Sequence, residues 1–432
     1  MAQAERAEAF ARLLGDLRAH LKLDVGFVLW NGTRIPAGLA PDALSIRIAD
    51  EGAVAALLRR PKLETVANLW VAGRLDLSGG TFFDLAARRP KLRAKAALRE
   101  LGAARVAGVA LRFLTVPRGG PFPLESVGDP AQGGTAAANT RNVQHHYDVS
   151  NDFYRLFLDP EMVYSCGYFR DWGNDLATAQ RDKLEMICRK LRLRPGERLL
   201  DVGCGWGALV CHAAMHHGVI AHGVTLSEAQ LALARDKVAR LGLSERVTLE
   251  LRDFAALDGA FDKIASIGMF EHVGLANHAR YFAAIHRLLK PGGLYLHHAI
   301  ARPAKRTEKD FRRRKPEYAA LTRYIFPGGE LDHVGMSLAN LQSHGFEVHD
   351  VEGWREHYAR TCRLWHDNLL ANTEAAAAAA SMVTVRLWLV YLAGCALAFE
   401  RNTVGIYQTL ASRRVRGPAG LPPTREDLYR NA

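Results

Sequence analysis

The stretch Leu199–Ala208 constrains the fold of this chain more than any other part of the sequence, and it reads Leu-Leu-Asp-Val-Gly-Cys-Gly-Trp-Gly-Ala. An apolar run ends at Asp201, three glycines follow at alternate positions, and the helix-like stretch Ala208–His217 comes next. A strand, a glycine turn and a helix in this order open a doubly wound α/β domain with a mostly parallel sheet. Glycines let the backbone turn sharply and bring its N–H groups close to a ligand. The N-terminus of the following helix favours a carboxylate or a phosphate, so the sequence predicts a ligand site at this loop.

The glycines are spaced G-x-G-x-G, which differs from the G-x-G-x-x-G of nicotinamide and flavin enzymes. The carboxylate of Asp201, just before the first glycine, can order the loop and meet the amino group of a cationic ligand. The loop resembles the first motif of class I S-adenosylmethionine-dependent methyltransferases. On the loop alone, a nucleotide-dependent oxidoreductase remains the alternative.

Apolar runs and helical patterns alternate beyond this loop, as they do in parallel sheets. The runs predict five strands, at Arg198–Val202, Ile220–Thr225, Val247–Leu251, Lys263–Ile267 and Gly293–His298. The intervening patterns predict helices, notably Glu228–Leu241 and His278–Leu289. We therefore expect a Rossmann-like α/β domain that binds its ligand beyond the carboxyl ends of the strands.

A chain of 432 residues is long enough for two domains. A stretch rich in Gly, Pro and Ala predicts a linker at 119–140, between an N-terminal domain at 1–118 and a catalytic domain at 141–432. The N-terminal part has helical spacing and short strand-like runs, at Ala4–Leu21, Val25–Ile35, Ala43–Ile48, Gly52–Arg59, Leu63–Ala72 and Leu75–Leu77. This small α+β pattern loosely resembles sterol-carrier-like lipid-binding domains, so we expect it to bind lipid or a membrane.

Basic residues outnumber acidic ones, 57 to 45, and the net charge of +12 predicts an anionic partner. A membrane surface, a nucleic acid and an acidic substrate all fit this charge. Two basic runs are either solvated faces or surfaces that bind phospholipid headgroups. They comprise Arg88, Arg89, Lys91, Arg93, Lys95 and Arg99 in the helical stretch Phe82–Leu101, and Arg302, Lys305, Arg306, Lys309, Arg312, Arg313, Arg314, Lys315 and Arg323.

The six cysteines show no paired C-x-x-C spacing, so we expect neither a metal site nor a disulfide framework. The N-terminal residues contain no apolar signal sequence, which predicts a cytoplasmic protein.

Ala375–Phe399 is long and apolar enough to cross a bilayer. However, a charge at Arg386, near its middle, is costly inside a membrane. We therefore expect a buried or partly amphipathic helix there.

Polar and aromatic residues follow the predicted strands, at the edge where such sheets bind ligands. Thr225 and Gln230 stand where methyltransferases commonly place an acidic residue for the ribose hydroxyls, and Phe254 can pack against an adenine. Upstream, Glu161–Phe169 and His145–Asp148 are expected to form a lid over the cofactor. The predicted cofactor-binding residues are Tyr164, Ser165, Asp201, Gly203, Gly205, Trp206, Gly207, Thr225, Leu226, Gln230, Phe254 and Ala255.

Seven stretches together closely resemble the cyclopropane-fatty-acyl-phospholipid synthase family, which includes the mycolic acid cyclopropane synthases. They are HHYDVSNDFYRLFLDPEMVYSCGYF (145–169), LLDVGCGWG (199–207), GVTLSEAQ (223–230), IGMFEHVG (267–274), LLKPGGLYLHHAI (288–300), YIFPGGEL (324–331) and HYARTCRLW (357–365). The resemblance covers roughly residues 140–412. It implies an enzyme that uses S-adenosylmethionine to methylenate cis double bonds in the acyl chains of phospholipids and releases S-adenosylhomocysteine.

The resemblance also implies the chemistry. Methyl transfer to the alkene leaves a carbocation, and ring closure then requires that a base remove a proton from the new methyl group. The implied base is a bound bicarbonate, held by Cys166, Glu271, His298, Tyr358 and the backbone of Ile300. Strand alternation points His297 and His298 to opposite faces, and the resemblance selects His298. An apolar pocket would exclude water from the cation, with Phe270 and Tyr324 as candidate aromatic faces.

Cys395 matches a cysteine once regarded as a catalytic candidate in the family, but its apolar helix favours packing in the core.

Two alternative functions stay open: a fatty-acyl C-methyltransferase that leaves a methyl branch or a methylene, and a non-catalytic lipid-binding protein. A nucleic-acid methyltransferase suits the charge, but no N-P-P-[YF] motif follows the fourth strand. We expect unsaturated phospholipids, and no nucleic acid, as partners of a peripheral protein at the inner face of the cell membrane. The sequence leaves a homodimer open.

Overall fold

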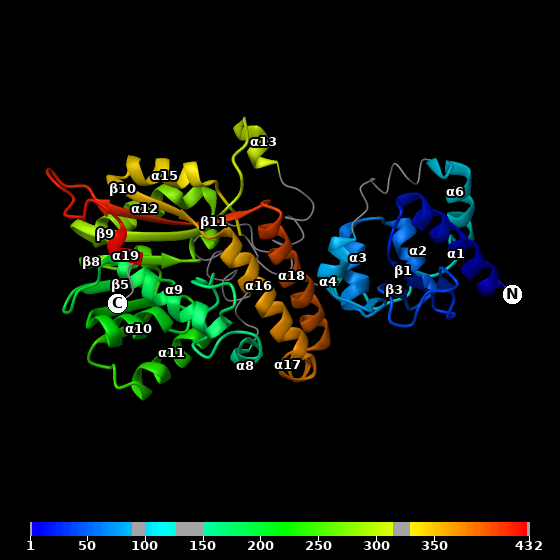
Figure 1. The fold of residues 1–432 in the computed structure, drawn as a ribbon, viewed down its shortest axis with the longest axis horizontal. Coiled ribbons are helices and arrows are strands. Elements are labelled where there is room, and N and C mark those ends of the chain that lie inside the picture. The colour runs from blue at the N-terminus through cyan, green and yellow to red at the C-terminus, as the bar shows by residue number, and fades with distance from the viewer. Residues whose placement is uncertain (1, 89–99, 127–149, 314–328, 430–432) are drawn as a thin grey trace. The chain divides into compact units, whose positions relative to one another are not determined.

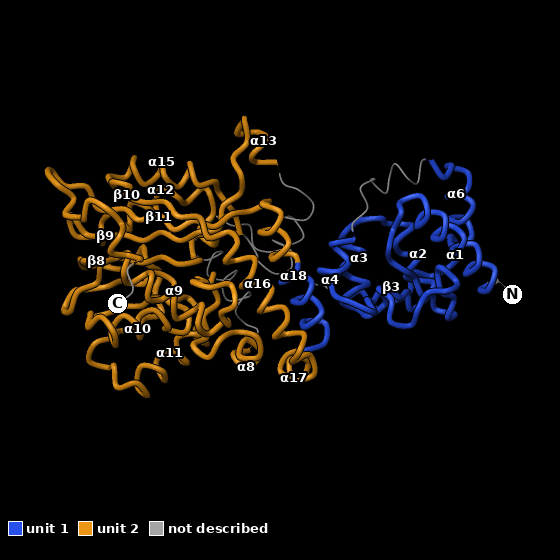
Figure 2. Tube along the Cα trace, in the orientation of Figure 1, with its two compact units in different colours: residues 1–128, 381–393 blue, residues 129–380, 394–432 orange. Residues whose placement is uncertain are grey.

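The computed structural model of the protein describes residues 2–88, 100–126, 150–313 and 329–429. The chain divides into two compact units, which Figure 2 shows in different colours. The first contains Met1–Gly128 and Ser381–Ala393, and the second contains Asp129–Ala380 and Gly394–Ala432. The division predicted from the sequence had assigned Ser381–Ala393 to the catalytic domain. The predicted lid segment at 145–148 and the linker beyond residue 126 lie outside the described residues.

The first unit contains a four-stranded sheet in the order β2-β1-β3-β4. The strands are β1 (Gly26–Val28), β2 (Arg34–Ile35), β3 (Ser45–Ile48) and β4 (Leu75–Ser78). The pair β1–β3 is parallel, and β1–β2 and β3–β4 are antiparallel. The strand-like stretch Val25–Ile35 contains the turn signal Asn31-Gly32, and it forms the β1–β2 hairpin, with a positive φ of +83° at Gly32.

Helices cover this sheet, and a ring cluster of Phe10, Trp30 and Phe113 lies in the core of the unit. The helices are α1 (Ala2–Leu21), α2 (Glu51–Arg59), α3 (Leu63–Val71), α4 (Phe82–Ala87) and α6 (Ala103–Arg112), with a 3₁₀ turn at Pro123–Ser126. The carboxylate of Asp50 caps α2 by accepting a hydrogen bond from the Ala53 N–H at 2.8 Å. The predicted helix Phe82–Leu101 ends early, because α4 stops at Ala87, and the basic residues at 89–99 lie outside the described residues.

The apolar stretch at 375–399 forms two helices where one was predicted, α17 (Thr373–Ala379) and α18 (Met382–Glu400). The hydroxyl of Ser381 starts α18 by accepting a hydrogen bond from the Thr384 N–H at 3.1 Å. Among the described residues, α18 alone has the length and composition of a membrane span, with a mean hydropathy of 1.8. Core helices of soluble proteins meet the same criterion, and 39% of its most apolar window is buried.

The second unit is built on a seven-stranded sheet in the order β10-β11-β9-β8-β5-β6-β7. Its strands are β5 (Arg198–Val202), β6 (Ile220–Thr225), β7 (Val247–Leu251), β8 (Phe261–Ile267), β9 (Leu289–Ala301), β10 (Phe346–Gly353) and β11 (Gly405–Arg413). Strands β5 to β9 are parallel, and β11 runs antiparallel to both of its neighbours. The predicted mostly parallel, doubly wound sheet is therefore confirmed.

Helices pack on both faces of this sheet (Figure 1). One face is covered by α9 (Leu176–Leu191), α10 (Ala208–His217) and α11 (Glu228–Arg240), and the other by α12 (His278–Leu288) and α15 (Val334–Ser343). The remaining helical segments are α8 (Asn151–Arg155), α13 (Glu308–Arg312), α16 (Arg355–Ala371), α19 (Glu426–Tyr429) and 3₁₀ turns at Phe254–Ala256, Phe270–His272 and Leu275–Asn277.

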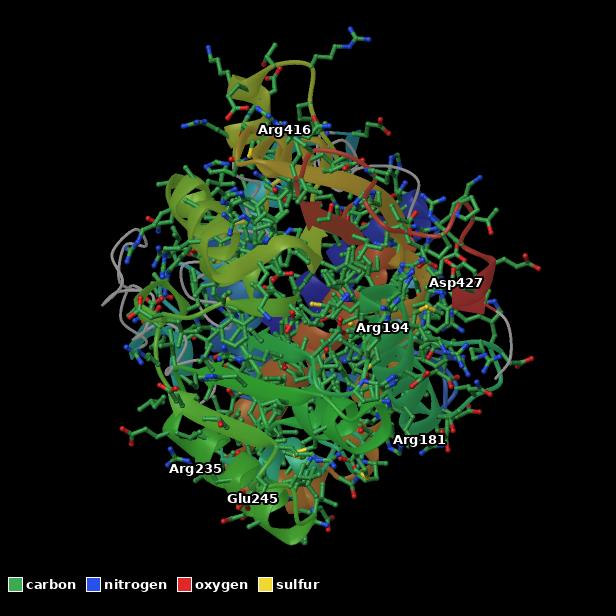
Figure 3. All side chains as sticks on the ribbon, turned by 90° about the vertical axis from the view of Figure 1, so that its left-hand side faces the viewer. Arg181, Arg194, Arg235, Glu245, Arg416 and Asp427 are labelled. Carbon is green, nitrogen blue, oxygen red and sulfur yellow. The ribbon has the colours of Figure 1, made fainter. Side chains whose placement is uncertain are left out.

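Three predicted strands, β5, β6 and β7, and the helix α10 have the predicted bounds. Strand β9 differs most, because it begins at Leu289, where the prediction ended a helix, and continues to Ala301. Charged side chains lie around the rim of the unit, as the exposed Arg181, Arg194, Arg235 and Glu245 show in Figure 3. The polar groups buried within the sheet therefore stand out as candidates for function.

Candidate functional site

Strand β5 lies between β6 and β8, so the chain passes to one side of β5 first and then returns to the other side. The crevice beyond the carboxyl ends of the strands at such a reversal is where open α/β sheets bind ligands. A cavity lies there, and all of the predicted cofactor-binding residues except Gly207 line it. These are Tyr164, Ser165, Asp201, Gly203, Gly205, Trp206, Thr225, Leu226, Gln230, Phe254 and Ala255.

The glycine loop forms the floor of the cavity. The backbone N–H groups of Gly203 and Cys204 both donate to the Val224 carbonyl, at 3.0 and 2.9 Å. Gly203 has a φ of +85°, and a Cβ placed on it would lie 2.8 Å from Cγ of Met269. Gly207 instead caps α10 with a φ of +82° and lies outside the cavity lining. The loop thus keeps open a space that a side chain at Gly203 would fill.

Hydrogen bonds hold the predicted ribose and adenine residues in place. The Thr225 hydroxyl donates to Oε1 of Gln230 at 2.9 Å, which leaves the amide NH₂ of Gln230 as a donor at the cavity. The carboxylate of Asp253 accepts from the Ala255 N–H at 2.9 Å. The ring of Phe254 packs edge-on against Tyr281, with ring centroids 5.2 Å apart.

The sequence analysis missed Lys183, which also lines the cavity. Its ammonium donates to Oγ of Ser165 at 3.0 Å. Burial lowers the pKa of Lys183 to about 8, and the nearby carboxylates of Asp159 and Asp201 oppose that shift. Burial likewise raises the pKa of Asp201 to about 7, although Lys183 lowers it. The loop carboxylate therefore has a buried cationic neighbour that the glycine motif does not reveal.

Glu271, on the 3₁₀ turn after β8, lies beside the end of β9. Its Oε1 accepts a hydrogen bond from the Ile300 N–H at 2.7 Å, so the backbone group predicted to hold bicarbonate binds this carboxylate. Its Oε2 is buried and has no hydrogen-bond partner among the described residues. Burial raises the pKa of Glu271 to about 7, against the lowering effect of the Ile300 hydrogen bond. A buried acceptor without a partner is costly, so this atom is suited to a ligand.

His298 carries a second buried polar atom of this kind. Its Nδ1 lies 3.1 Å from Nε2 of Gln408, and its own Nε2 has no hydrogen-bond partner in the part of the chain that the structure describes. Burial holds the pKa of His298 well below its usual range, and the nearby Lys183 and Lys190 add to the effect. His297 points to the opposite face, where its ring lies 3.0 Å from the Tyr295 hydroxyl. The predicted alternation of the two histidines is confirmed.

Cys166 and Tyr358 lie in the same region. The Cys166 thiol is 3.8 Å from the Trp354 carbonyl, and burial raises its pKa well above its usual range. Burial also raises the pKa of Tyr358, and Cys166 and Glu271 are among the nearby groups that add to the rise. Cys166, Glu271, His298, Ile300 and Tyr358 all lie outside the lining of the cofactor cavity, and the neighbouring residues Ser165 and Met269 do line it.

Two further residues of the prediction are Cys395 and Phe270. Cys395 lies on α18 near Cys362, and both Cys395 and Cys166 add to the raised pKa of the Cys362 thiol. Phe270 packs in the core on the other face of the sheet, where its ring lies 4.6 Å from His297 and 5.0 Å from Tyr281. The prediction that Phe270 faces the cation is therefore wrong, because its ring is enclosed by these neighbours. Tyr324 is outside the described residues.

One cluster contains three side chains that could bind a metal. Cys188, His212 and His217 place ligand atoms within 4.8 Å of one another, between α9 and α10. The sequence spacing gave no sign of this group. The carboxylate of Glu185 lies 3.3 Å from Nε2 of His212 and 3.0 Å from Nε2 of His217, and Cys188 packs in the apolar core. Hydrogen bonds between the two helices therefore account for this arrangement.

The raised pKa of Glu271 predicts a pH-dependent stability. Between its ordinary value of 4.5 and about 7, the folded protein holds this proton more tightly than the unfolded chain does. The stabilisation is complete below pH 4.5 and is lost as the pH rises through 7. We expect the free energy of unfolding of Glu271→Gln to rise by about 2–3 kcal/mol relative to wild type between pH 5 and pH 8, measured by urea unfolding without ligand. The exposed Glu245→Gln is the matched control, and a constant difference between Glu271→Gln and wild type would contradict the raised pKa.

Comparison with known proteins agrees with this geometry. The family model described as mycolic acid cyclopropane synthetase matches residues 135–409. A probable fatty acid methyltransferase of Pseudomonas putida is 37% identical over 95% of this chain and 97% of its own. The cyclopropane-fatty-acyl-phospholipid synthase of Escherichia coli is 38% identical over 63% of this chain and 68% of its own.

Solved structures extend the comparison. The cyclopropane synthase MmaA2 from Mycobacterium tuberculosis is 33% identical, with a TM-score of 0.60 over 63% of this chain and 98% of that one. The mycolic acid cyclopropane synthase CmaA1, complexed with SAH and CTAB, is 36% identical, with a TM-score of 0.59 over the same shares. This chain therefore belongs to the mycolic acid cyclopropane synthetase family, and it is an S-adenosylmethionine-dependent methyltransferase related to cyclopropane synthases and fatty acid methyltransferases.

Proposed function

We propose that the protein is a cyclopropane-fatty-acyl-phospholipid synthase that uses bound bicarbonate as its base. The observation that carries this proposal is the pair of buried atoms without partners, Oε2 of Glu271 and Nε2 of His298. Bicarbonate has one hydroxyl donor and anionic oxygens that accept. A carboxylate accepts only, and a neutral imidazole nitrogen can donate. The two residues therefore match both kinds of polar group on this ion.

The residues of the cofactor cavity hold S-adenosylmethionine, which supplies an electrophilic methyl group. Ser165 and Met269 line that cavity. Ser165 directly precedes Cys166 and Met269 stands two residues before Glu271, which supports a base site that adjoins the methyl donor. In methyl transfer, the π electron pair of the cis alkene would form the new C–C bond while the sulfur–methyl bond breaks. S-adenosylhomocysteine then leaves as a neutral thioether, and the positive charge remains on the other alkene carbon. The side chains of Glu271, His298 and Tyr358 hold the base that takes a proton from the new methyl group, and the C–H electron pair closes the ring. Glu271 and His298 are buried, which excludes the water that would otherwise capture the cation.

The second candidate is a fatty-acyl C-methyltransferase, which the similarity to a probable fatty acid methyltransferase supports. The two functions differ in where the cation loses its proton. The assay uses purified protein, S-adenosylmethionine and vesicles of unsaturated phospholipid, with mass spectrometry and NMR of the lipid products. A cyclopropane ring supports the synthase, whereas a methyl branch or an exocyclic methylene supports the methyltransferase. Unchanged lipid with an active methyl donor would contradict both.

The bicarbonate proposal makes its own prediction. We expect the rate of cyclopropane formation to fall when carbon dioxide is stripped from the buffer, and to recover when bicarbonate is added. General-base assistance contributes about 10²- to 10⁴-fold, so a loss approaching 100-fold is expected under complete depletion. Binding of S-adenosylmethionine, measured by calorimetry in the same buffers, is the control and should stay constant. Full activity in depleted buffer, with no bicarbonate retained by the protein, would contradict the proposal.

We further propose that the protein acts as a peripheral protein on anionic phospholipid at the inner face of the cell membrane. The net charge of +12 supports this, together with the exposed basic side chains of Lys305, Arg306, Lys309 and Arg313 around α13. These residues follow Ala301, the last residue of the strand that carries His298. The basic residues 314, 315 and 323 lie outside the described residues. A basic side chain near an anionic membrane contributes about 1 kcal/mol.

Charge reversal tests this placement. We expect Lys305→Glu, Arg306→Glu and Lys309→Glu together to weaken binding to phosphatidylglycerol vesicles by more than about 100-fold, because three lost attractions remove about 3 kcal/mol and each new carboxylate adds a repulsion. Binding by the wild type should also fall steeply with salt. Reversing Arg181, Arg194 and Arg235, which are exposed elsewhere on the same unit, makes the same change in net charge and is the control. Equal losses of vesicle affinity in the two triple variants would contradict the proposal. Binding to neutral vesicles with an affinity that does not change with salt concentration would also contradict it.

A further inference from the structure

A hydrogen-bonded chain of three buried side chains runs from Lys190 through Gln408 to His298. It meets the His298 ring at Nδ1, and the other ring nitrogen, Nε2, takes no part in it. The Lys190 ammonium on α9 donates to Oε1 of Gln408 on β11, at 2.7 Å. Nε2 of Gln408 then lies 3.1 Å from Nδ1 of His298 on β9. Gln408 and His298 are paired residues on neighbouring strands, and all three side chains are about 1% exposed. No solvent molecule is therefore needed to complete this connection.

The direction of each hydrogen bond in this chain follows from the chemistry of its groups. An ammonium group can only donate, so the amide atom that faces Lys190 is the oxygen. The other amide atom is then the NH₂ group, which also only donates. Nδ1 of His298 must accept that hydrogen bond and so carries no proton. In a neutral imidazole the proton then lies on Nε2, which is the buried nitrogen without a partner.

The surroundings keep both ends of this chain in the required states. Lys190 forms an ion pair with Glu352, which opposes the effect of burial on its pKa and favours the charged ammonium. The ammonium also lies 5.2 Å from the ring centre of Trp354, and that ring packs edge-on against His298 at 5.2 Å. Lys183 and Lys190 oppose a charge on the imidazole, so His298 stays neutral.

We propose that Lys190 and Gln408 are positioning residues that hold His298 as the Nε2–H tautomer, a hydrogen-bond donor to the anion in the base site. This rests on the proposed function. Because Nε2 already bears a proton and Nδ1 is occupied, His298 is not the group that accepts the proton from the substrate methyl. It holds one anionic oxygen of the base, while Glu271 Oε2 accepts from the hydroxyl. The base therefore has one orientation, set by one donor and one acceptor.

The test inverts the tautomer without changing the size of the side chain. In Gln408→Glu the carboxylate accepts from Lys190 and also from Nδ1–H of His298, so the proton moves to Nδ1 and Nε2 becomes an acceptor. The tautomer is measured by ¹⁵N–¹H NMR of ¹⁵N-histidine-labelled protein, and the His298 signals are assigned by their loss in His298→Gln. We expect Nε2–H in wild type and Nδ1–H in Gln408→Glu. An Nδ1–H tautomer in wild type, or Nε2–H retained in the variant, overturns the proposal.

The kinetic readout separates positioning from folding. Loss of one buried donor to an anion lowers rates by about 10²- to 10³-fold, and we expect a loss of that order in cyclopropane formation by Gln408→Glu. Its S-adenosylmethionine affinity should stay at the wild-type value, because Gln408 lies outside the cofactor cavity. Gln342→Glu, the same change at an exposed site, is the matched control. An inverted tautomer with an unchanged rate overturns the proposed role.

A second variant guards against loss of the fold. Lys190→Met removes the donor that orients the amide, so we expect a mixture of His298 tautomers and a smaller loss of rate. A pure Nε2–H signal in Lys190→Met contradicts the orienting role of Lys190. Failure of the proposed function would give a different pair of results. The wild type would then show the Nε2–H tautomer by NMR but would form no cyclopropane with any phospholipid.

Discussion

Glu271→Gln should lower the rate of cyclopropane formation by about 10²- to 10⁴-fold at pH 8, while S-adenosylmethionine binds with near wild-type affinity. The glutamine can still accept from the Ile300 N–H through Oε1, so the local backbone is kept. It replaces the acceptor Oε2 with an NH₂ group, which would face the hydroxyl of bicarbonate donor to donor. At pH 8 the wild-type side chain, whose pKa is about 7, is mainly a carboxylate.

Calorimetry and product analysis on the same preparations separate binding from chemistry. Glu271 lies outside the cofactor cavity, so a change in cofactor affinity is not expected. Glu245→Gln, the same substitution at an exposed site, is the control. If Glu271→Gln formed cyclopropane at the wild-type rate, or lost its cofactor affinity, the assignment of Glu271 to the base site would be wrong.

Gly203→Val should abolish cofactor binding, with a loss of affinity on the order of 100-fold or more. The residue has a φ of +85°, which a β-branched side chain rarely adopts, and its Cβ would lie 2.8 Å from Cγ of Met269. Relief of this contact moves the loop or Met269, and both form the cavity wall. Calorimetry with S-adenosylmethionine measures the loss.

Gly242→Val is the matched control, because Gly242 also has a positive φ, of +67°, but a Cβ there meets nothing within 4 Å. Both variants carry backbone strain, and only Gly203→Val fills space in the cavity. Gly203→Ala provides a milder change if the valine variant does not fold. Equal cofactor affinity in Gly203→Val and Gly242→Val would show that the loop does not bind the cofactor as described.

The sequence predicted well those strands that consist of an apolar run followed directly by turn residues. In β5, four consecutive buried residues lead directly into the glycine turn, and this order of residues predicts a buried strand that ends at the turn. Strands β10 and β11 were missed for opposite reasons. The edge strand β10 is mostly exposed or half-buried and carries little apolar pattern, whereas β11 buries the polar side chains Gln408, Thr409 and Ser412 inside the sheet. A rule based on apolar runs fails where buried positions are polar.

The same reasoning explains which site residues the sequence revealed. The cofactor loop lies within one continuous stretch. The residues of the base site come from β9, α16, a 3₁₀ turn and a loop, so the sequence named them only through the resemblance to a family and the fold brings them together. Lys183 and Lys190 do form a recognisable pattern in the sequence. They lie seven residues apart in α9, on the face that also buries Leu184 and Ile187. A lysine on the apolar face of a helix is rarely buried without a partner, so this pattern could have indicated buried polar partners, although the sequence analysis did not use it.

Helix α18 determines how this protein can be divided or recombined. Its residues Ser381–Ala393 belong with the N-terminal unit. Arg386 there lies 4.0 Å from the ring centre of Trp70 and pairs with Asp76 at 3.1 Å. The N-terminal module is thus encoded by two separate segments of the gene. A fragment that begins after residue 128 would expose Arg386 and the apolar side chains beside it, so a chimera that exchanges this module must exchange both segments.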